Sequence, residues 1–219
     1  MLSKSRITGP VLALIVSAPA LADAPAPTAM EAAIAARLVD AACFDVAPGG
    51  AACDRVLLLT SETLEGMVDL LIVPSNEAMA PLVARDFALH RDLDGQRARL
   101  ANGENGSFLV HSQQSSHGRY PWFETLEIAY HDDAFQVVGY MYSTYDRPMG
   151  GDFSCDVDLV AGTWRAVGVR VDPESMEDTI DWDTVGQDFP DETDVRWWSF
   201  REPPPHCDEI LASWFDHAP

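Results

Sequence analysis

The fold is decided by a stretch in the middle of the chain, which reads WFETLEIAYH at residues 122–131, DD at 132–133 and AFQVVGYMYSTY at 134–145. Two runs rich in β-branched and aromatic residues flank a two-residue acidic break. This pattern is typical of two antiparallel strands joined by a tight turn. The stretch therefore predicts a β-hairpin.

Counting outward from a turn at 132–133 predicts the cross-strand pairs, because side chains on paired strands alternate between two faces. One face is apolar enough to be core and pairs Ile128 with Val137, Tyr130 with Phe135 and Leu126 with Gly139. The other face pairs Phe123 with Tyr142 and Thr125 with Tyr140. Exposed aromatic side chains on a sheet can stack against sugar rings or anchor a partner protein. Phe123, Tyr140 and Tyr142 are therefore candidate binding residues, unless this face packs beneath a second sheet or the N-terminal helix.

Further strand signals lie on both sides of this hairpin. The turn-forming run NGENG at 102–106 separates two short strand candidates, and Ala161-Gly162 separates two more. Apolar runs at 56–60 and 68–73 are predicted to be buried strands, with pieces of helix as the alternative. We therefore expect a mainly β fold: a single antiparallel β-meander or sandwich-like domain over residues 23–219, with an N-terminal helix and a short C-terminal helix.

The two helices are expected at the ends of this domain. Thr28 and Glu31 form a capping-box pattern, and the helix is predicted to continue to Ala42. Asp208 and Glu209 favour the first turn of the C-terminal helix, because the helix dipole stabilises anions there. The buried stripe of this second helix is predicted to contain Ile210, Leu211, Trp214 and Phe215.

The first 22 residues predict export. Lys4 and Arg6 precede an apolar run at 11–16, and the small residues of Ala20-Leu21-Ala22 follow as a cleavage site. The apolar stretch is shorter than the roughly 20 residues that a membrane-spanning helix requires. We expect residues 1–22 to be a signal peptide and the protein to be periplasmic or extracellular, with no membrane insertion after cleavage.

The charge balance argues against two classes of partner. The chain carries 14 basic and 35 acidic residues, a formal charge of −21. Binding to nucleic acid or to an anionic membrane surface requires clustered basic residues. We therefore expect neither partner, and look instead to an unidentified protein or a glycan.

The four cysteines are Cys43, Cys53, Cys155 and Cys207, and they permit three disulfide pairings. The turn-forming run Pro48-Gly49-Gly50 favours a local bond between Cys43 and Cys53, which leaves Cys155 to pair with Cys207. A thiolate metal site or redox pair is the alternative, but the Cys-x-x-Cys spacing is absent.

The acidic segment at 172–194 is predicted to be an irregular connection, followed by a strand at 195–201. Within it, Asp181, Asp183 and Glu192 occupy the first, third and twelfth positions of a calcium-loop pattern. Gly186 fits the sixth position, but Val185 departs from the pattern at the fifth. A calcium site and a plain acidic loop remain the alternatives, and no other cofactor is predicted.

Three histidines, His111, His117 and His131, lie near serine and aspartate residues in the sequence. A Ser–His–Asp relay requires a nucleophile on a strained turn beside an oxyanion pocket, and no Gly-x-Ser-x-Gly element is present. A hydrolase would require these histidines to converge with a carboxylate or a serine in a cleft.

The segments Trp122–Ile128, Phe135–Tyr142 and Cys155–Gly162 resemble parts of uncharacterised exported bacterial proteins. In that group an apolar hairpin is likewise followed by a strand with Asp or Asn and a turn similar to Leu-x-x-Gly. The resemblance extends over Ser107–Trp164 and implies a β-rich periplasmic or secreted protein. It carries over no catalytic residue.

Three functions are compatible with these features. The first hypothesis is an exported, non-enzymatic binding or accessory protein that meets its partner through the aromatic face or the acidic loop. The second is a hydrolase of envelope or extracellular polymers, and the third is a calcium-stabilised structural module.

Overall fold

The computed structural model describes residues 28–50, 52–91, 93, 95–148, 150–172, 174–175, 178–187, 193–198, 200 and 204–216. The predicted signal peptide, residues 1–22, lies outside the described residues.

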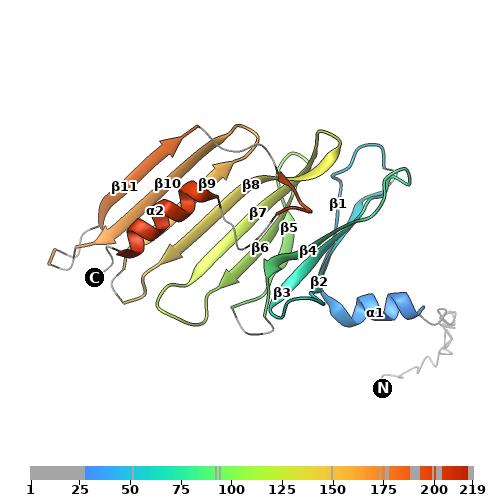
Figure 1. Ribbon diagram of the computed structural model, residues 1–219, viewed down its shortest axis with the longest axis horizontal. Coiled ribbons are helices and arrows are strands. Elements are labelled where there is room, and N and C mark those ends of the chain that lie inside the picture. The colour runs from blue at the N-terminus through green and yellow to red at the C-terminus, as the bar shows by residue number, and fades with distance from the viewer. Residues whose placement is uncertain are drawn as a thin grey trace, which may run out of the picture.

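Two antiparallel sheets and two helices make up the described chain (Figure 1). The four-stranded sheet contains, in spatial order, β1 (Leu38–Phe44), β2 (Asp54–Thr60), β3 (Met67–Val73) and β4 (Leu82–Leu89). The eight-stranded sheet contains, in spatial order, β5 (Arg99–Asn102), β6 (Phe108–Gln114), β7 (Trp122–His131), β8 (Ala134–Tyr145), β9 (Asp152–Asp158), β10 (Thr163–Val171) and β11 (Asp178–Gly186), and β12 (Thr193–Asp194) pairs with β8. The helices are α1 (Ala29–Arg37) and α2 (Pro205–Asp216). The predicted mainly β fold with a helix near each end is confirmed.

The central hairpin forms as predicted at its tip. Ile128 pairs with Val137 and Tyr130 pairs with Phe135. Asp132 and Asp133 both adopt positive φ angles, of 45° and 61°, as a two-residue turn of the primed type requires.

A β-bulge then changes the register of this hairpin. The pairing shifts between Glu127 and Ile128, where Val138 is the extra residue on β8. Beyond it, Leu126 pairs with Tyr140, so its predicted pairing with Gly139 is wrong. The predicted pairs on the other face are wrong for the same reason, because Phe123 lies opposite Ser143 and Thr125 lies opposite Met141. The bulge moves Tyr140 and Tyr142 to the face of the sheet that carries Leu126.

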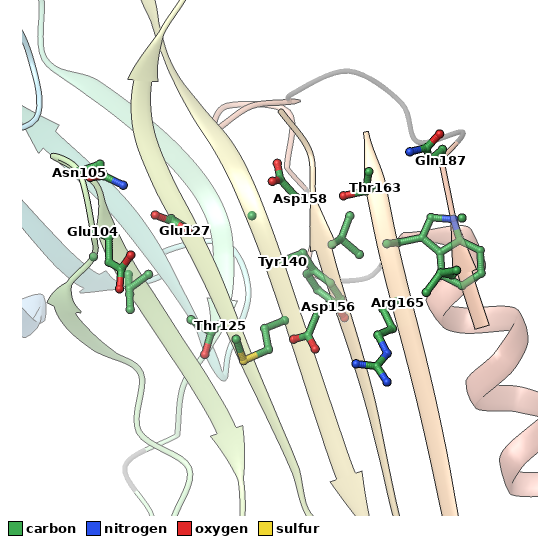
Figure 2. A pocket seen from close by; sticks show the side chains of 18 of the residues that line it. Glu104, Asn105, Thr125, Glu127, Tyr140, Asp156, Asp158, Thr163, Arg165 and Gln187 are labelled. Atoms are coloured by element: carbon green, nitrogen blue, oxygen red, sulfur yellow. The ribbon is translucent and has the colours of Figure 1, made fainter. Parts of the chain in front are cut away.

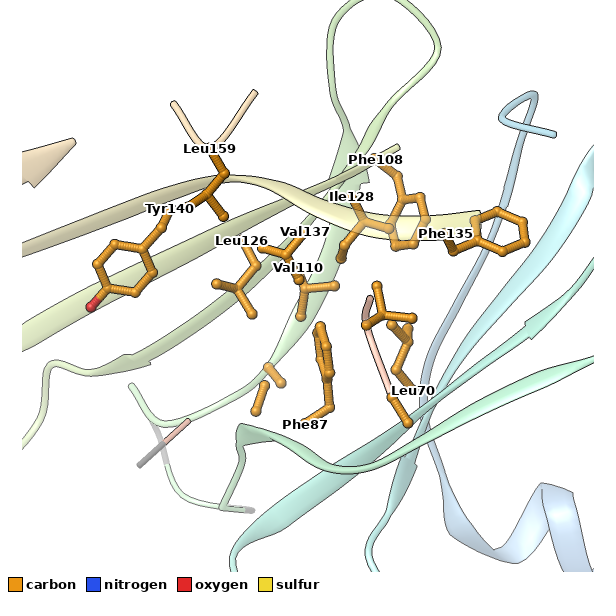
Figure 3. Close-up of a cluster of buried hydrophobic side chains, with 14 of the residues drawn as sticks. Leu70, Phe87, Phe108, Val110, Leu126, Ile128, Phe135, Val137, Tyr140 and Leu159 are labelled. Atoms are coloured by element: carbon orange, nitrogen blue, oxygen red, sulfur yellow. The ribbon is translucent and has the colours of Figure 1, made fainter. Parts of the chain in front are cut away.

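The hydrophobic core lies between the two sheets. Phe87 and Leu70 of the small sheet point toward Val110, Leu126 and Ile128 of the large sheet (Figure 3). Each of these side chains is almost completely buried. The two sheets therefore stabilise each other by removing their facing apolar side chains from water.

Helix α2 covers a further part of the same face of the large sheet, over β9 and β10 (Figure 1). Its buried residues are Cys207 and Trp214. The indole Nε1 of Trp214 donates to the carbonyl of Val169 at 3.5 Å, and Cys207 is bonded to Cys155 on β9. Both predicted disulfides are present, at sequence separations of 10 for Cys43–Cys53 and 52 for Cys155–Cys207.

The predicted N-terminal helix is shorter than expected. It begins with the predicted capping box of Thr28 and Glu31 but ends at Arg37 instead of Ala42. Residues 38–44 form strand β1, which pairs with β2. Phe44 at the end of this strand stacks on Phe108 of the core, with ring centroids 5.1 Å apart. The packing of this strand on the core outweighs the helix propensity of its local sequence.

The acidic segment also differs from its prediction. Residues 178–186 form β11, an edge strand paired with β10, where an irregular connection was expected. The predicted strand at 195–201 is wrong for residues 195–197, which form a turn in which the backbone N–H of Trp197 donates to the carbonyl of Asp194; residues 199 and 201 lie outside the described residues. Among the described residues of this segment, Thr193 and Asp194 pair with β8.

In the part of the chain that the structure describes, neither helix has the length and apolar character needed to cross a membrane.

Candidate functional site

The inner face of the large sheet leaves a cavity where its cover changes from the small sheet to α2. The volume of this cavity is about 390 Å³. Its described lining, which we call the Glu124 cavity, consists of Leu89, Trp122, Glu124, Tyr140, Tyr142, Phe200, Cys207, Asp208 and Leu211. It is therefore formed by β4, β7, β8, α2 and the segment that precedes α2.

Strands β7 and β8 place the central side chains of this cavity. Glu124 lies directly opposite Tyr142, and Leu126 lies opposite Tyr140. Alternation along β7 turns Trp122 and Glu124 toward the same face as Leu126. The bulge at Val138 turns the side chains of Tyr140 and Tyr142 on β8 toward this same face.

Aromatic rings form much of the cavity wall. Trp122 stacks with Tyr142 at a centroid distance of 6.5 Å and an interplanar angle of 18°. The ring centroids of Phe200 and Trp122 are 5.6 Å apart, and those of Tyr140 and Trp198 are 5.8 Å apart. These contacts hold large flat surfaces against the cavity, where they can contact a ligand at little cost in conformational entropy.

Glu124 is the unusual residue of the site. Its side chain is only 4% exposed, although glutamate is seldom buried without a charged partner. The hydroxyl of Ser112 donates to its Oε1 at 3.3 Å. Burial raises the pKa of Glu124 to about 8, and the hydrogen bond from Ser112 offsets only part of this effect. At pH 7 such a carboxyl is about nine-tenths protonated.

The two cavity tyrosines are also affected by burial. Burial and the nearby carboxylate of Glu124 raise the pKa of Tyr142 to about 12. The same two causes raise the pKa of Tyr140. Both phenols are therefore neutral hydrogen-bonding groups at ordinary pH.

The charge of the described lining is one-sided. It contains two carboxyl groups, from Glu124 and Asp208, and no Lys, Arg or His side chain. Asp208 lies in the first turn of α2 and is exposed. The cavity therefore combines an apolar, aromatic interior with an acidic group at its surface.

A second concavity lies on the opposite face of the large sheet, and we call it the outer groove. Its volume is about 1180 Å³, and its lining includes Glu127, Asp156, Asp158 and Arg165. Figure 2 shows these side chains on β7, β9 and β10. It is accessible to solvent, and Met141 along it is 52% exposed.

Three of the charged groups of the outer groove already have partners within the protein. Glu127 accepts a hydrogen bond from the hydroxyl of Ser107, and Asp158 accepts one from the backbone N–H of Ala161 at 2.8 Å. Arg165 donates from Nε to Oδ1 of Asp183 at 2.9 Å and from Nη2 to Oδ2 of Asp183 at 3.0 Å. Glu127, Asp158 and Arg165 therefore contribute to the structure of the sheet surface.

The predicted binding residues do not share one face. Tyr140 and Tyr142 line the Glu124 cavity, where Tyr140 is only 4% exposed. Phe123 lies on the other side of β7 and is 36% exposed. The structure therefore brings two of the three predicted residues together, inside a cavity and not on an open aromatic surface.

The predicted calcium ligands lie on and beyond β11. Asp181 and Asp183 are two residues apart on this strand, and Asp183 is paired with Arg165. Glu192 lies outside the described residues. Within the described ranges, no three His, Cys, Asp or Glu side chains are grouped so that they could hold a metal ion. The calcium site stays a prediction.

The histidines considered for hydrolysis lie on separate elements. His111 in β6 is within 2.8 Å of the hydroxyl of Thr125, and His117 contacts Ser116 at 2.6 Å in the loop after β6. His131 ends β7, six residues beyond Thr125, which corresponds to about 20 Å along a strand. Their arrangement gives no support to a shared catalytic centre.

Comparison with known proteins adds no assignment. No protein-family model, no curated protein and no solved structure matches this chain. The function must therefore be argued from the site itself.

Glu124 was not among the predicted site residues, although the sequence contains a signal for it. Period-2 alternation from Ile128 and Leu126 places position 124 on the predicted core face. A carboxyl group on a core face is a candidate for function, because burial perturbs its pKa. Asp208 and Phe200 carry no comparable signal. Leu211 was predicted to lie in the buried stripe of the C-terminal helix, but its place beside Glu124 depends on tertiary packing.

Proposed function

We propose that the protein is an exported, non-enzymatic binding protein that holds a small ligand in the Glu124 cavity. One observation carries the proposal: Glu124 is 4% exposed and lines a cavity, and among the described residues its one hydrogen-bond partner is Ser112. A buried carboxyl group with unused hydrogen-bonding capacity is costly. A ligand in the cavity would supply the missing partner.

The composition of the lining supports binding of a mainly apolar molecule. Ligand sites commonly combine apolar and aromatic walls with a few polar groups that orient the ligand. Here Trp122, Phe200 and Leu211 supply the walls, and Glu124 and Tyr142 supply polar groups. The volume of about 390 Å³ suits a small molecule.

The disulfides support the location. Cys43–Cys53 and Cys155–Cys207 fit an oxidising compartment. Export through the predicted signal at residues 1–22 would deliver the chain to such a compartment.

Fluorescence titration with N-phenyl-1-naphthylamine, a neutral apolar probe, tests the proposal on the oxidised protein. We expect saturable enhancement of probe fluorescence with the natural chain. Leu211→Trp fills the cavity and should abolish the enhancement. Val185→Trp makes a comparable change at a position that is 71% exposed in the outer groove, and should leave the titration unchanged.

Circular dichroism of both variants shows whether they are folded at the assay temperature. Loss of probe binding in Val185→Trp, with binding retained in Leu211→Trp, would place the probe in the outer groove and overturn the proposal. Absence of saturable binding to the natural chain would overturn it as well.

A further inference from the structure

The class of ligand can be inferred from the charges around the Glu124 cavity, and this inference rests on the proposed function. The described lining supplies two carboxyl groups and no basic side chain. No ion pair within the described residues involves Glu124. A positively charged ligand would therefore be the partner that this lining lacks.

The aromatic faces point to the same class. Two rings elsewhere in the protein have a guanidinium group over one face: Arg170 lies 4.7 Å from the ring centroid of Trp182, and Arg119 lies 5.1 Å from that of Tyr120. Trp122 and Tyr142 line the cavity as a stacked pair, and no Lys, Arg or His side chain belongs to the described lining there. Organic cations bind favourably over such faces, most strongly when they are removed from water.

The shape of the site distinguishes an organic cation from a metal ion. A hard metal ion such as calcium requires six to eight oxygen ligands, whereas the described lining offers carboxyl groups only from Glu124 and Asp208. Apolar side chains, including Leu89 and Leu211, occupy positions where such an ion would need oxygen atoms or water. An ammonium group with an apolar substituent is complementary to both parts of the lining.

We propose that the Glu124 cavity binds a small organic cation, an alkylammonium or arylammonium compound. The charged nitrogen lies between the Glu124 carboxylate and the rings of Trp122 and Tyr142, and the apolar part contacts Leu89 and Leu211. Asp208 stands at the surface of the cavity, and the formal charge of −21 attracts cations toward the protein.

The test compares two probes of nearly equal shape and different charge. Phenyltrimethylammonium carries a permanent positive charge, and tert-butylbenzene is its neutral counterpart. Their affinities are measured by displacement of N-phenyl-1-naphthylamine at pH 8.5, where Glu124 is largely ionised. We expect phenyltrimethylammonium to bind about tenfold more tightly than tert-butylbenzene.

Matched carboxyl variants identify the group responsible. Glu124→Gln keeps the size of the side chain and should reduce the preference for the cation to about twofold or less. Glu127→Gln makes the same change three residues along β7, on the face of the outer groove, and should leave the preference unchanged. A preference lost in Glu127→Gln and kept in Glu124→Gln would overturn the inference.

Failure of this inference is distinguishable from failure of the proposed function. Equal affinities for the two probes, or displacement by neither probe while N-phenyl-1-naphthylamine still binds in the cavity, would overturn the cation class alone. If N-phenyl-1-naphthylamine itself does not bind, both proposals fail together.

Discussion

Glu124 and Tyr142 lie directly opposite each other on β7 and β8, and both side chains line the cavity that α2 partly covers. Burial makes the ionised form of each unfavourable, and the carboxylate of Glu124 raises the pKa of Tyr142 further. The pair therefore places a carboxyl group and a phenol in a region of low polarity. Its properties lead to measurable consequences for stability and for binding.

The first prediction concerns stability and pH. The pKa of Glu124 rises from 4.5 to about 8 on folding, so between these values the folded state binds a proton that the unfolded state has released. The free energy of unfolding therefore falls with rising pH in this window, by about 1.4 kcal/mol per pH unit from this group. Urea unfolding of the oxidised protein at pH 5 and pH 8 measures the effect.

The variant Glu124→Gln isolates this contribution. Its side chain at position 124 cannot titrate. The free energy of unfolding of the variant minus that of the natural chain should therefore increase as the pH rises from 5 to 8. Other groups, such as His111, whose pKa is lowered by burial and by Arg99, affect both proteins alike and cancel in the difference. A difference that does not change with pH would show that Glu124 is not held protonated in the folded protein.

The second prediction concerns binding and pH. A cation binds the ionised form of Glu124 more tightly than the protonated form. The affinity for phenyltrimethylammonium should therefore rise by about five- to tenfold in total between pH 6 and pH 9, mostly around pH 8, and then level off. The probe has a permanent charge and does not titrate. The other polar groups that face Glu124 are Ser112 from β6, Tyr140 and Tyr142 from β8 and Asp208 from α2.

Isothermal titration calorimetry between pH 6 and pH 9 measures this dependence. The raised pKa values of Tyr140 and Tyr142 keep both phenols neutral over this range. Glu124→Gln should give a weak affinity without the rise. An equally steep rise in that variant would assign the dependence to another group.

The third prediction separates the two disulfides. Cys155–Cys207 closes a loop at a separation of 52 residues and holds α2 on β9, whereas Cys43–Cys53 spans 10. Loop-closure entropy predicts losses of about 4 kcal/mol for Cys155→Ala/Cys207→Ala and about 2.7 kcal/mol for Cys43→Ala/Cys53→Ala. The first double variant should also weaken N-phenyl-1-naphthylamine binding, because Cys207 lines the cavity.

The second double variant serves as the control for binding, since its disulfide lies on the small sheet. Urea unfolding and probe titration of both variants check the two effects. Unchanged probe binding in the variant without Cys155–Cys207 would show that this disulfide does not maintain the cavity.

The fourth prediction concerns the turn of the central hairpin. Asp132 and Asp133 both adopt positive φ, which is unfavourable for residues with a Cβ atom. Asn-Gly is the preferred pair for such a turn. Asp132→Asn/Asp133→Gly should therefore stabilise the protein by about 1 kcal/mol, measured by thermal unfolding, and a loss of stability would contradict the turn geometry.

The hairpin at 122–145 could be predicted from the sequence because local alternation and turn residues determine it. Its register could be predicted only as far as the bulge. Val138 carries no signal that distinguishes it from Val137, so counting along a regular ladder misplaced Tyr140 and Tyr142. Strand β1 was missed for a related reason. The helical pattern before Ala42 can be seen in the local sequence, whereas the contact between Phe44 and the core joins residues far apart in the chain.

The site was less predictable than the fold. Alternation places Glu124 on the core face, which is a local property of β7. The cavity itself depends on how α2 and the end of β4 cover that face, and those contacts join residues far apart in the chain. Leu89 and Leu211, for example, meet the same space from different elements, and no sequence pattern relates them.

The crystal structure of the oxidised protein with phenyltrimethylammonium tests the central claim most directly. The account predicts the probe in the Glu124 cavity, with its nitrogen against the carboxylate of Glu124 and within about 6 Å of the ring centroid of Trp122. Density for the probe in the outer groove, beside Asp156 or Glu127, with an empty cavity would contradict the account.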